Sequence, residues 1–324
     1  MTGPIALTCG EPAGVGPEIA AKAWAFLGTA LPFFYMGDPS HLPAGTPVRV
    51  IDTPSEAAEA AHHGVPVLAF DMGGPSTPGH PDPAHAPVVI EVIARAVELV
   101  RQGEAAALCT LPIHKKALKD GANFAYPGHT EYLAALAGSE HVVMMLACDA
   151  LRVVPATIHI PLSEVPRALT PESLERTIRI THAALMDRFG IDFPRIAVAG
   201  LNPHAGEGGA IGREEVDWIA PLVDRLRVDG FDLRGPASAD TMFHAAARDR
   251  YDAAIAMYHD QALIPIKTID FAGGVNVTLG LPFVRTSPDH GTAFDIAGTG
   301  LADPTSTIAA LRMAARMAGR MSHA

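Results

Sequence analysis

Short apolar runs alternate with longer amphipathic stretches through most of this chain. The apolar runs predict strands at residues 5–9, 33–36, 65–70, 106–110, 142–147, 153–159, 196–199 and 253–257. Longer stretches with helical spacing predict helices at residues 84–102, 171–189, 213–228 and 305–321. Thr170 followed by Pro171 is typical of a helix start, and Gly190 is typical of a helix end.

Strands separated by helices of this length indicate βαβ units. The expected fold class is therefore α/β, with mainly parallel sheets and flanking helices. Ligands of open parallel sheets bind at the carboxyl ends of the strands. Polar side chains that follow the predicted strands are therefore the first candidates for function.

Three histidines lie at such strand ends. His159 closes the run 153–159, His204 follows 196–199 in LNPHAGEGG, and His259 follows 253–257 in MYHDQ. Three converging neutral imidazoles would hold a divalent metal and leave a coordination position open for a substrate. Taken singly, each histidine is more simply a polar cap on a strand end. The joint pattern favours a metal site.

A second group of side chains is cationic or polar and suits an anionic ligand. Lys267 lies in the apolar segment ALIPIKTID, where it must reach solvent or meet an anion. Arg285 and Asn276 follow in the next segments, and a guanidinium suits a carboxylate or a phosphate. His129 and Thr130 open a predicted helix whose backbone N–H groups could receive an oxyanion. An ordinary surface ion pair is the alternative for Lys267 and Arg285.

Two further segments have simpler interpretations. The glycine-rich GEPAGVGPE follows the first strand but does not have the GxGxxG spacing of a Rossmann fingerprint. The segment could equally be a tight turn between a strand and a helix, with Glu11 exposed. Residues 114–116 (HKK) could face a phosphate, but the solvated start of a helix is the favoured interpretation.

The composition narrows the class of partner. The chain has 324 residues with 24 Lys and Arg against 35 Asp and Glu, which gives a formal net charge of −11. With 48% apolar and 18% charged residues it has the composition of a globular protein. An acidic chain without a basic run is not expected to bind nucleic acid or an anionic membrane.

The compartment is inferred from the cysteines and the N-terminus. Three cysteines, none of them in a CxxC pair, do not make a disulfide framework. The start MTGPIALTCGEP has neither a basic region nor a long apolar region, and no apolar stretch is long enough to span a bilayer. We therefore expect a cytoplasmic protein.

Six motifs in order along the chain resemble one enzyme family. They are GEPAGVGPEI, PGHTEY, GLNPHAGEGG, ADTMF, AMYHDQALIPIK and VNVTLGLPFVRTSPDHGTAFDIAGTG. Together they resemble the 4-hydroxythreonine-4-phosphate dehydrogenases of bacterial vitamin B6 synthesis. Glu11 in TCGEP stands where many relatives have Asp, which is a conservative difference.

The resemblance implies a two-domain fold like that of isocitrate and isopropylmalate dehydrogenases. Residues 1–128 with 282–324 would form a discontinuous cofactor-side domain, and 129–281 would form a central domain with the metal ligands and the dimer interface. The active site would lie in the interdomain cleft of a homodimer, with residues from both subunits.

The resemblance also assigns roles to residues. It places the metal ligands on His159, His204 and His259, which are the three strand-end histidines. It places substrate contacts on His129, Thr130, Lys267, Asn276 and Arg285, with Asp240 nearby. The segment PDHGTAFDIAG resembles the adenosine-binding loop of isopropylmalate dehydrogenases and implies cofactor contacts from His290, Gly291, Thr292 and Asp295.

The implied reaction is oxidation of a phosphorylated 3-hydroxy acid by NAD(P), assisted by a divalent metal such as Zn, Mg or Co. The β-keto acid formed would lose CO2 to give 3-amino-1-hydroxyacetone 1-phosphate. Asp240 or Lys267 would accept the hydroxyl proton, and the sequence does not choose between them. An acidic residue at Asp295 would repel a 2′-phosphate, which predicts NAD in preference to NADP.

Three other functions fit parts of the pattern. A related dehydrogenase could act on D-threonate or D-erythronate 4-phosphate, in which a hydroxyl replaces the amine. A metal site with three histidines could instead hydrolyse a phosphate or an ester, although the cofactor-loop resemblance counts against this. A non-catalytic metal- or metabolite-binding protein has no positive feature in its favour.

Overall fold

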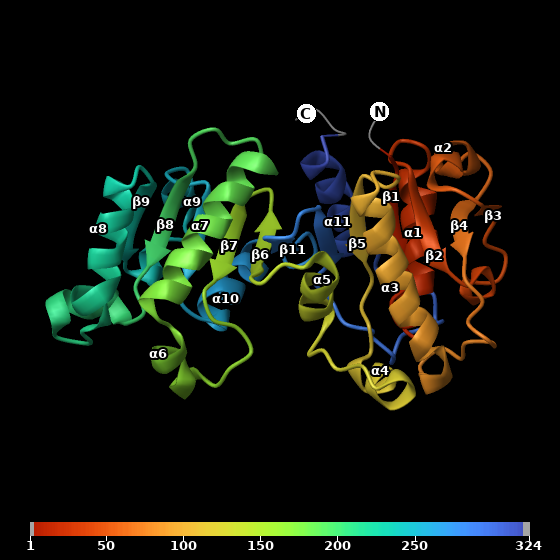
Figure 1. Ribbon diagram of the computed structural model, residues 1–324, viewed down its shortest axis with the longest axis horizontal. Coiled ribbons are helices and arrows are strands. Elements are labelled where there is room, and N and C mark those ends of the chain that lie inside the picture. The colour runs from red at the N-terminus through yellow and green to blue at the C-terminus, as the bar shows by residue number, and fades with distance from the viewer. Residues whose placement is uncertain (1–2, 320–324) are drawn as a thin grey trace. The chain divides into compact units, whose positions relative to one another are not determined.

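The computed structural model describes residues 3–319, and two compact units make up the chain. Unit 1 comprises residues 1–141 and 281–324, and unit 2 comprises residues 142–280 (Figure 1). The boundary expected after residue 128 lies before the helix α5 (His129–Ala137), whereas the division at 141/142 places α5 in unit 1.

Unit 1 is built on six parallel strands. In spatial order they are β3 (Val48–Ile51), β4 (Val65–Ala69), β2 (Phe33–Gly37), β1 (Ile5–Thr8), β5 (Ala107–Thr110) and β12 (Arg285–Pro288). All four residues of β1 are buried, as expected for a central parallel strand that is covered on both faces. Phe33, Phe34 and Tyr35 of β2 continue this core.

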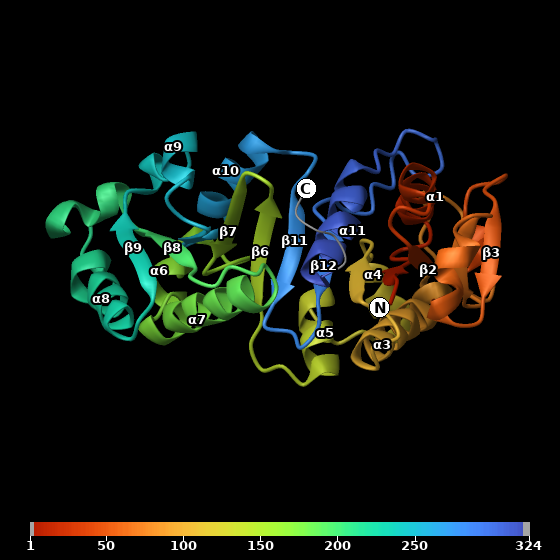
Figure 2. The same cartoon turned by 90° about the horizontal axis from the view of Figure 1, so that it is seen from above.

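Helices cover both faces of the unit 1 sheet. They are α1 (Gly16–Leu27), α2 (Ala57–Ala60), α3 (Ala86–Arg101), α4 (Lys115–Ala122), α5 and α11 (Thr305–Met317). Helices α1 and α11 contact each other on one face, and α3 lies on the other face with α4 and α5 beside it (Figure 2). The helix expected at 305–321 ends at Met317, and positions 320 and 321 of that expectation lie outside the described residues.

Unit 2 has a mixed sheet. Its strands in spatial order are β11 (Val275–Leu279), β6 (Val143–Cys148), β7 (Leu151–Pro155), β10 (Ala253–Ala256), β8 (Arg195–Ala199) and β9 (Asp232–Ala237). Strand β6 is antiparallel to both β11 and β7, and the strands from β7 to β9 are parallel. The expected α/β class with mainly parallel strands is confirmed.

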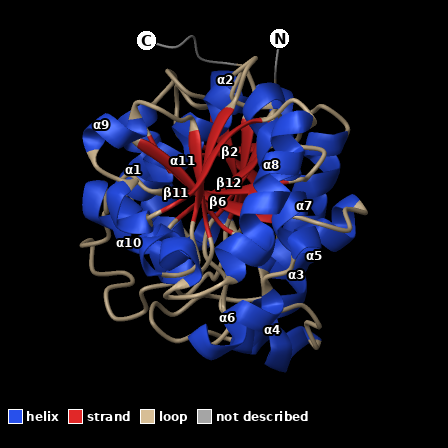
Figure 3. Ribbon diagram, turned by 90° about the vertical axis from the view of Figure 1, so that its left-hand side faces the viewer, coloured by secondary structure: helices blue, strands red, loops and turns tan. Residues whose placement is uncertain are grey.

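The helices of unit 2 also lie on both sides of their strands, with α9 and α10 on one side and α7 and α8 on the other (Figure 3). They are α6 (Val165–Ala168), α7 (Pro171–Asp187), the π-helical turn Glu215–Ile219, α8 (Ala220–Val228), α9 (Ala245–Arg248) and α10 (His259–Ile269). Helix α7 starts as predicted, because the Thr170 hydroxyl accepts a hydrogen bond from the Ser173 N–H at 3.2 Å. None of the helices described between residues 3 and 319 is long and apolar enough to cross a bilayer.

Candidate functional site

The three strand-end histidines lie shortly after three adjacent strands of unit 2, His159 and His204 in loops and His259 at the start of a helix. Strands β7, β10 and β8 are neighbours in the sheet and run parallel. His159 follows β7, His259 follows β10 and His204 follows β8. Because these strands are parallel, their carboxyl ends lie at one edge of the sheet, with neighbouring strands about 4.8 Å apart.

His159 and His259 are close to each other. Their ring centroids are 5.7 Å apart, and both residues line a pocket of about 320 Å³ together with Thr157 and Tyr258. His259 is the first residue of α10, and its Nδ1 donates a hydrogen bond to Asp260 Oδ1 at 2.7 Å. This hydrogen bond leaves Nε2 as the ring nitrogen of His259 that could bind a ligand.

The sequence pattern suggested that His159 closes a strand, but the structure places it beyond the strand end. Strand β7 ends at Pro155, and His159 has φ 52°, in the left-handed region. That conformation does not belong to an extended strand, so His159 lies in the loop after β7. The Thr157 hydroxyl donates to the main-chain oxygen of Met257 at 2.7 Å and so ties this loop to the loop that carries His259.

His204 lies in a loop with unusual backbone geometry. The five residues from His204 to Gly208 all have positive φ, which is costly for the three that carry a side chain. The buried carboxylate of Glu215 holds the loop in place. It accepts hydrogen bonds from the Asn202 N–H at 2.7 Å and from Asn202 Nδ2 at 2.9 Å.

Asp240 lies close to His204. It belongs to a short 3₁₀ turn, Ala239–Thr241, and its carboxylate accepts a hydrogen bond from the Ser238 hydroxyl. That hydrogen bond is the main cause that lowers the pKa of Asp240. Asp240 is therefore an ionised, solvent-accessible carboxylate beside one of the three histidines.

The donor set suits a divalent metal in its chemistry, but the ligands are not assembled. Among residues 3–319, no three His, Cys, Asp or Glu side chains are close enough together to hold an ion. His159 and His259 are paired, and His204 lies on the adjoining strand-end loop. Neutral imidazoles with a carboxylate partner on one ring are typical ligands of a Zn-type ion.

Lys267 and Asn276 belong to the same unit. Lys267 is half-buried on α10, and its Nζ lies 5.3 Å from the centre of the Phe271 ring. The apolar surroundings of Lys267 that the sequence predicts thus include an aromatic face. Asn276 lies on β11. Its Oδ1 is buried and accepts no hydrogen bond from the described residues, so it is available to a ligand donor.

Unit 1 contains a separate group of cationic and polar side chains. Arg285, the first residue of β12, is only 4% exposed, and its Nη2 donates to the hydroxyl of Thr110 at 2.7 Å. Burial lowers the pKa of Arg285 to about 10, so it stays protonated at neutral pH. A buried guanidinium is well suited to an anionic ligand.

His129 and Thr130 form the first turn of α5 in the same unit. Burial, followed by the positive charges of Arg285 and Lys115, lowers the pKa of His129 well below its usual value. The ring is therefore neutral at pH 7. Its Nε2 is buried and has no hydrogen-bond partner among the described residues, which leaves it available to a ligand.

Gly128 allows a lysine to approach this group. It is the N-cap of α5, and a Cβ there would lie 3.3 Å from Cε of Lys115. The interpretation of residues 114–116 as a solvated helix start suits Lys116, which pairs with Asp120 on the surface of α4. Lys115, in contrast, lies against the N-terminus of α5.

The loop expected to bind the cofactor follows β12. His290 Nδ1 donates to the carbonyl of Gly291 at 2.9 Å, while its Nε2 is buried and has no partner among the described residues. Thr292 accepts a hydrogen bond from the Val15 N–H at 3.0 Å, and Asp295 is exposed. The loop thus presents a buried ring nitrogen and an exposed carboxylate.

Of the interpretations left open for this segment, the structure rules out the one in which Glu11 is exposed. Glu11 is only 3% exposed, and its Oε1 accepts a hydrogen bond from the Ala13 N–H at 3.1 Å. The turn folds back over this carboxylate, and burial raises the pKa of Glu11. A sequence pattern does not reveal such a fold-back, because it depends on the turn conformation.

The side chains that support the site were the ones missing from the sequence analysis. Thr110 and Glu215 hold Arg285 and the His204 loop, respectively. Thr110 is 175 residues from its partner along the chain, so no local signal links them. Glu215 lies in the charged stretch GREEVD, which looks like an ordinary solvated helix start.

Parallel strands flanked by helices, with polar groups at the strand ends of both units, define the class: a two-unit α/β enzyme. The chain belongs to the family of the pyridoxal phosphate biosynthetic protein PdxA, whose family model matches residues 30–314.

Named relatives and solved structures agree with this family. The chain is 65% identical over 320 residues to 4-hydroxythreonine-4-phosphate dehydrogenase of Roseobacter denitrificans, covering 98% of each chain. It is 65% identical over 321 residues to the enzyme of that name from Paracoccus denitrificans, again covering 98% of each. The crystal structure of 4-hydroxythreonine-4-phosphate dehydrogenase from Klebsiella pneumoniae has a TM-score of 0.90 and 39% identity, with 98% of each chain covered.

Proposed function

We propose that this protein oxidises 4-phosphohydroxy-L-threonine with NAD in the synthesis of pyridoxal 5′-phosphate. The geometric observation that carries the proposal is the set of three histidines that follow three adjacent parallel strands. The similarity to relatives of that name over nearly the whole chain supports the choice of substrate.

The substrate would be anionic at both ends, and the chain offers side chains for both. Arg285, His129 and Thr130 of unit 1 would bind one anionic group, with the guanidinium supplying charge and the neutral imidazole a hydrogen bond. Lys267 and Asn276 of unit 2 would contact the rest of the substrate through an ammonium and a buried amide oxygen.

His159, His204 and His259 would hold the divalent ion. Such an ion, when bound, lowers the pKa of a substrate hydroxyl and stabilises negative charge on its oxygen. Glu215 would keep the His204 loop in its strained conformation, and Asp260 would orient the His259 ring through its hydrogen bond.

Asp240 is the better candidate for the proton acceptor. Its carboxylate is exposed to solvent beside His204, whereas the Lys267 ammonium lies over the Phe271 ring. The hydroxyl proton would pass to Asp240, and NAD held by the loop after β12 would supply the acceptor for the hydride on the same carbon. The resulting β-keto acid would lose CO2, and the carbon left behind would take up a proton to give 3-amino-1-hydroxyacetone 1-phosphate.

His290, Gly291, Thr292 and Asp295 would contact the dinucleotide. The exposed carboxylate of Asp295 suits a ribose 2′-hydroxyl and would repel a 2′-phosphate, which favours NAD over NADP. We further propose a homodimer, which light scattering on the purified protein would test.

The decisive experiment is NADH formation measured at 340 nm with 4-phosphohydroxy-L-threonine, D-threonate 4-phosphate and D-erythronate 4-phosphate. We expect turnover with the first substrate, loss of activity with a chelator, and recovery on adding Zn, Co or Mg. His204→Ala should lower kcat/KM by at least about a hundredfold, because a metal ligand is lost.

His244→Ala is the matched control, because His244 is an exposed residue of the same unit at the N-terminus of α9 and lies outside the strand-end set. Turnover of only the two sugar-acid phosphates would replace the proposed substrate. Phosphate release without NADH would indicate a hydrolase. Equal loss of activity in both variants would contradict the metal assignment.

A further inference from the structure

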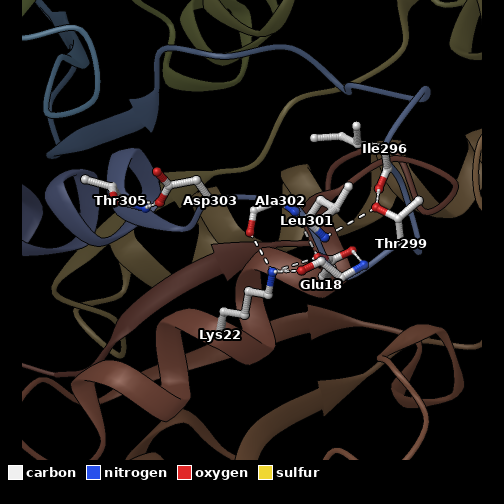
Figure 4. A network of polar contacts seen from close by, with 9 residues as sticks. Glu18, Lys22, Ile296, Thr299, Leu301, Ala302, Asp303 and Thr305 are labelled. Atoms are coloured by element: carbon white, nitrogen blue, oxygen red, sulfur yellow. Dashed lines mark hydrogen bonds and ion pairs between the residues drawn. The ribbon is translucent and has the colours of Figure 1, made fainter.

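Glu18 and Lys22 form an ion pair on α1 that also binds a distant loop. They lie one turn apart on the helix, and Lys22 Nζ donates to Glu18 Oε1 at 2.8 Å. The same ammonium donates to the main-chain oxygens of Gly300 at 2.8 Å and Ala302 at 2.6 Å (Figure 4). All three N–H donors of the ammonium are thus used within the protein.

The carboxylate of Glu18 accepts hydrogen bonds from the N–H groups of the same stretch of backbone. Its Oε1 accepts the Ala302 N–H at 3.1 Å, and its Oε2 accepts the Gly300 N–H at 3.3 Å. Glu18 is only 7% exposed, so its charge depends on these partners. The two side chains together satisfy both the N–H and the C=O groups of Gly300 and Ala302.

The loop held in this way is the one that carries the expected cofactor contacts. It connects β12, which ends at Pro288, to α11, which begins at Thr305, and has no helix or strand of its own. Its early part is attached to the turn before α1, through the hydrogen bond from the Val15 N–H to Thr292. Its later part is attached to α1 through Glu18 and Lys22.

Apolar packing adds little at this end of the loop. Leu301 is 73% exposed, although it lies between the two residues that Glu18 and Lys22 bind. The methyl group of Ala302 is buried but small. The loop's position next to α1 therefore depends mainly on the polar contacts of the pair.

We infer that Glu18 and Lys22 are positioning residues for the dinucleotide: they hold the 290–302 loop in its binding conformation and so set the affinity for NAD. This inference rests on the proposed function, because it takes that loop as the cofactor site. It adds that Lys22 does not bind the 2′-phosphate of NADP itself, since carbonyls and Glu18 already occupy its donors.

The test is steady-state kinetics of Lys22→Met with NAD and NADP as the varied substrates. We expect KM for NAD to rise about tenfold or more, with kcat and the KM of the phosphorylated substrate within about twofold of wild type. KM for NADP should rise by the same factor, so the ratio of KM for NAD to KM for NADP stays constant. Lys22→Arg, which keeps a cation with several donors, should restore most of the affinity.

Lys116→Met is the matched control, because Lys116 also pairs with an acidic residue four positions away on a helix of unit 1. It should leave all these constants unchanged. Hydrogen exchange provides a readout independent of turnover: the Gly300 and Ala302 amides should exchange faster in Lys22→Met and Glu18→Gln than in wild type.

Equilibrium titration of NAD by calorimetry separates this inference from the proposed function. If wild type binds NAD and Lys22→Met binds it equally well, the positioning role is wrong and the proposed function stands. A rise in KM for NADP with an unchanged KM for NAD would also overturn the inference, because Lys22 would then be a direct ligand of the 2′-phosphate. If wild type does not bind NAD at all, both the proposed function and this inference fail.

Discussion

Arg285 holds a positive charge inside unit 1, and burial disfavours that charge. Its pKa falls from an ordinary 12.5 to about 10, which corresponds to roughly 3 kcal/mol lost from the stability of the folded state. Because the folded-state pKa is the lower one, the cost is fully present below pH 10. This cost to stability disappears as the pH rises from about 10 to above the ordinary pKa of 12.5 that Arg285 has in the unfolded chain.

Replacing Arg285 by Met should therefore separate stability from binding. We expect Arg285→Met to raise the free energy of unfolding at pH 7 by ~1–3 kcal/mol, because the buried charge is removed from a site of similar volume. The KM of the phosphorylated substrate should rise by at least about a hundredfold, because a charge-assisted contact is lost.

Urea unfolding and initial-rate kinetics on the same preparations measure the two effects. Thr110→Val is a useful comparison, since it removes the hydroxyl that accepts from Nη2 and keeps the charge. A less stable Arg285→Met protein would mean that the guanidinium contributes to the fold more than burial costs.

At the scale of elements, the loop after β8 is held by an acidic side chain on the π-helical turn. Glu215 binds both the main chain and the side chain of Asn202, and a Cβ at Gly206 would lie 2.6 Å from Glu215 Oε2. The loop thus closes tightly around this carboxylate. The left-handed conformation of His204 is maintained by these contacts.

Glu215→Gln should loosen that loop while leaving the histidines in place. Glutamine has one acceptor oxygen where the carboxylate has two, so one hydrogen bond from Asn202 is lost. We expect zinc affinity to fall by about tenfold or more, measured by competition with a zinc indicator. Asp217→Asn, which removes only a surface pair with Arg213, should bind zinc like wild type. Equal affinities in all three proteins would contradict the supporting role of Glu215.

The hydrophobic pattern predicts the buried elements well and the polar ones poorly. The central strands and the helices α3, α7, α8 and α11 lie close to their expected positions, because burial on a whole face leaves a periodic signal. Strand β12 reads RTSP and β9 contains Gly235-Pro236, so neither resembles a strand in isolation. Helix α10 was also not predicted from the sequence, because it contains Pro265, a residue that is unusual inside a helix.

The candidate site follows the same division. His159, His204 and His259 could be singled out because each follows an apolar strand, and local sequence shows that. Their arrangement could not be read, because it depends on the strand order β7-β10-β8, in which β10 inserts between two strands that precede it in the chain. The contacts of Glu18 and Lys22 join residues about 280 positions apart and leave no local trace.

At the scale of the whole molecule, the two ligand sets fall in different units. The three histidines belong to unit 2, whereas Arg285 and His129 belong to unit 1. Each unit also has its own buried core, with Phe33, Phe34 and Tyr35 in unit 1 and a cluster around Val153, Ala254 and Ile266 in unit 2. A ligand of one set should therefore stabilise its own unit in the first place.

The chain's two tryptophans make this testable, because Trp24 lies in unit 1 and Trp218 in unit 2. In Trp24→Phe the remaining fluorescence reports on unit 2, and in Trp218→Phe it reports on unit 1. We expect zinc at a hundred times its Kd to shift the urea transition seen by Trp218 by up to ~2.7 kcal/mol, and that seen by Trp24 by much less. Inorganic phosphate should show the opposite preference.

Two comparisons make the result interpretable. Zinc added to a His204→Ala protein should move neither transition, because a ligand in unit 2 is missing. If zinc shifts both transitions equally in the otherwise unaltered protein, the two units unfold as one cooperative body. That result would contradict the division into separately stabilised units. The His204→Ala control would then decide whether His159, His204 and His259 are the zinc ligands.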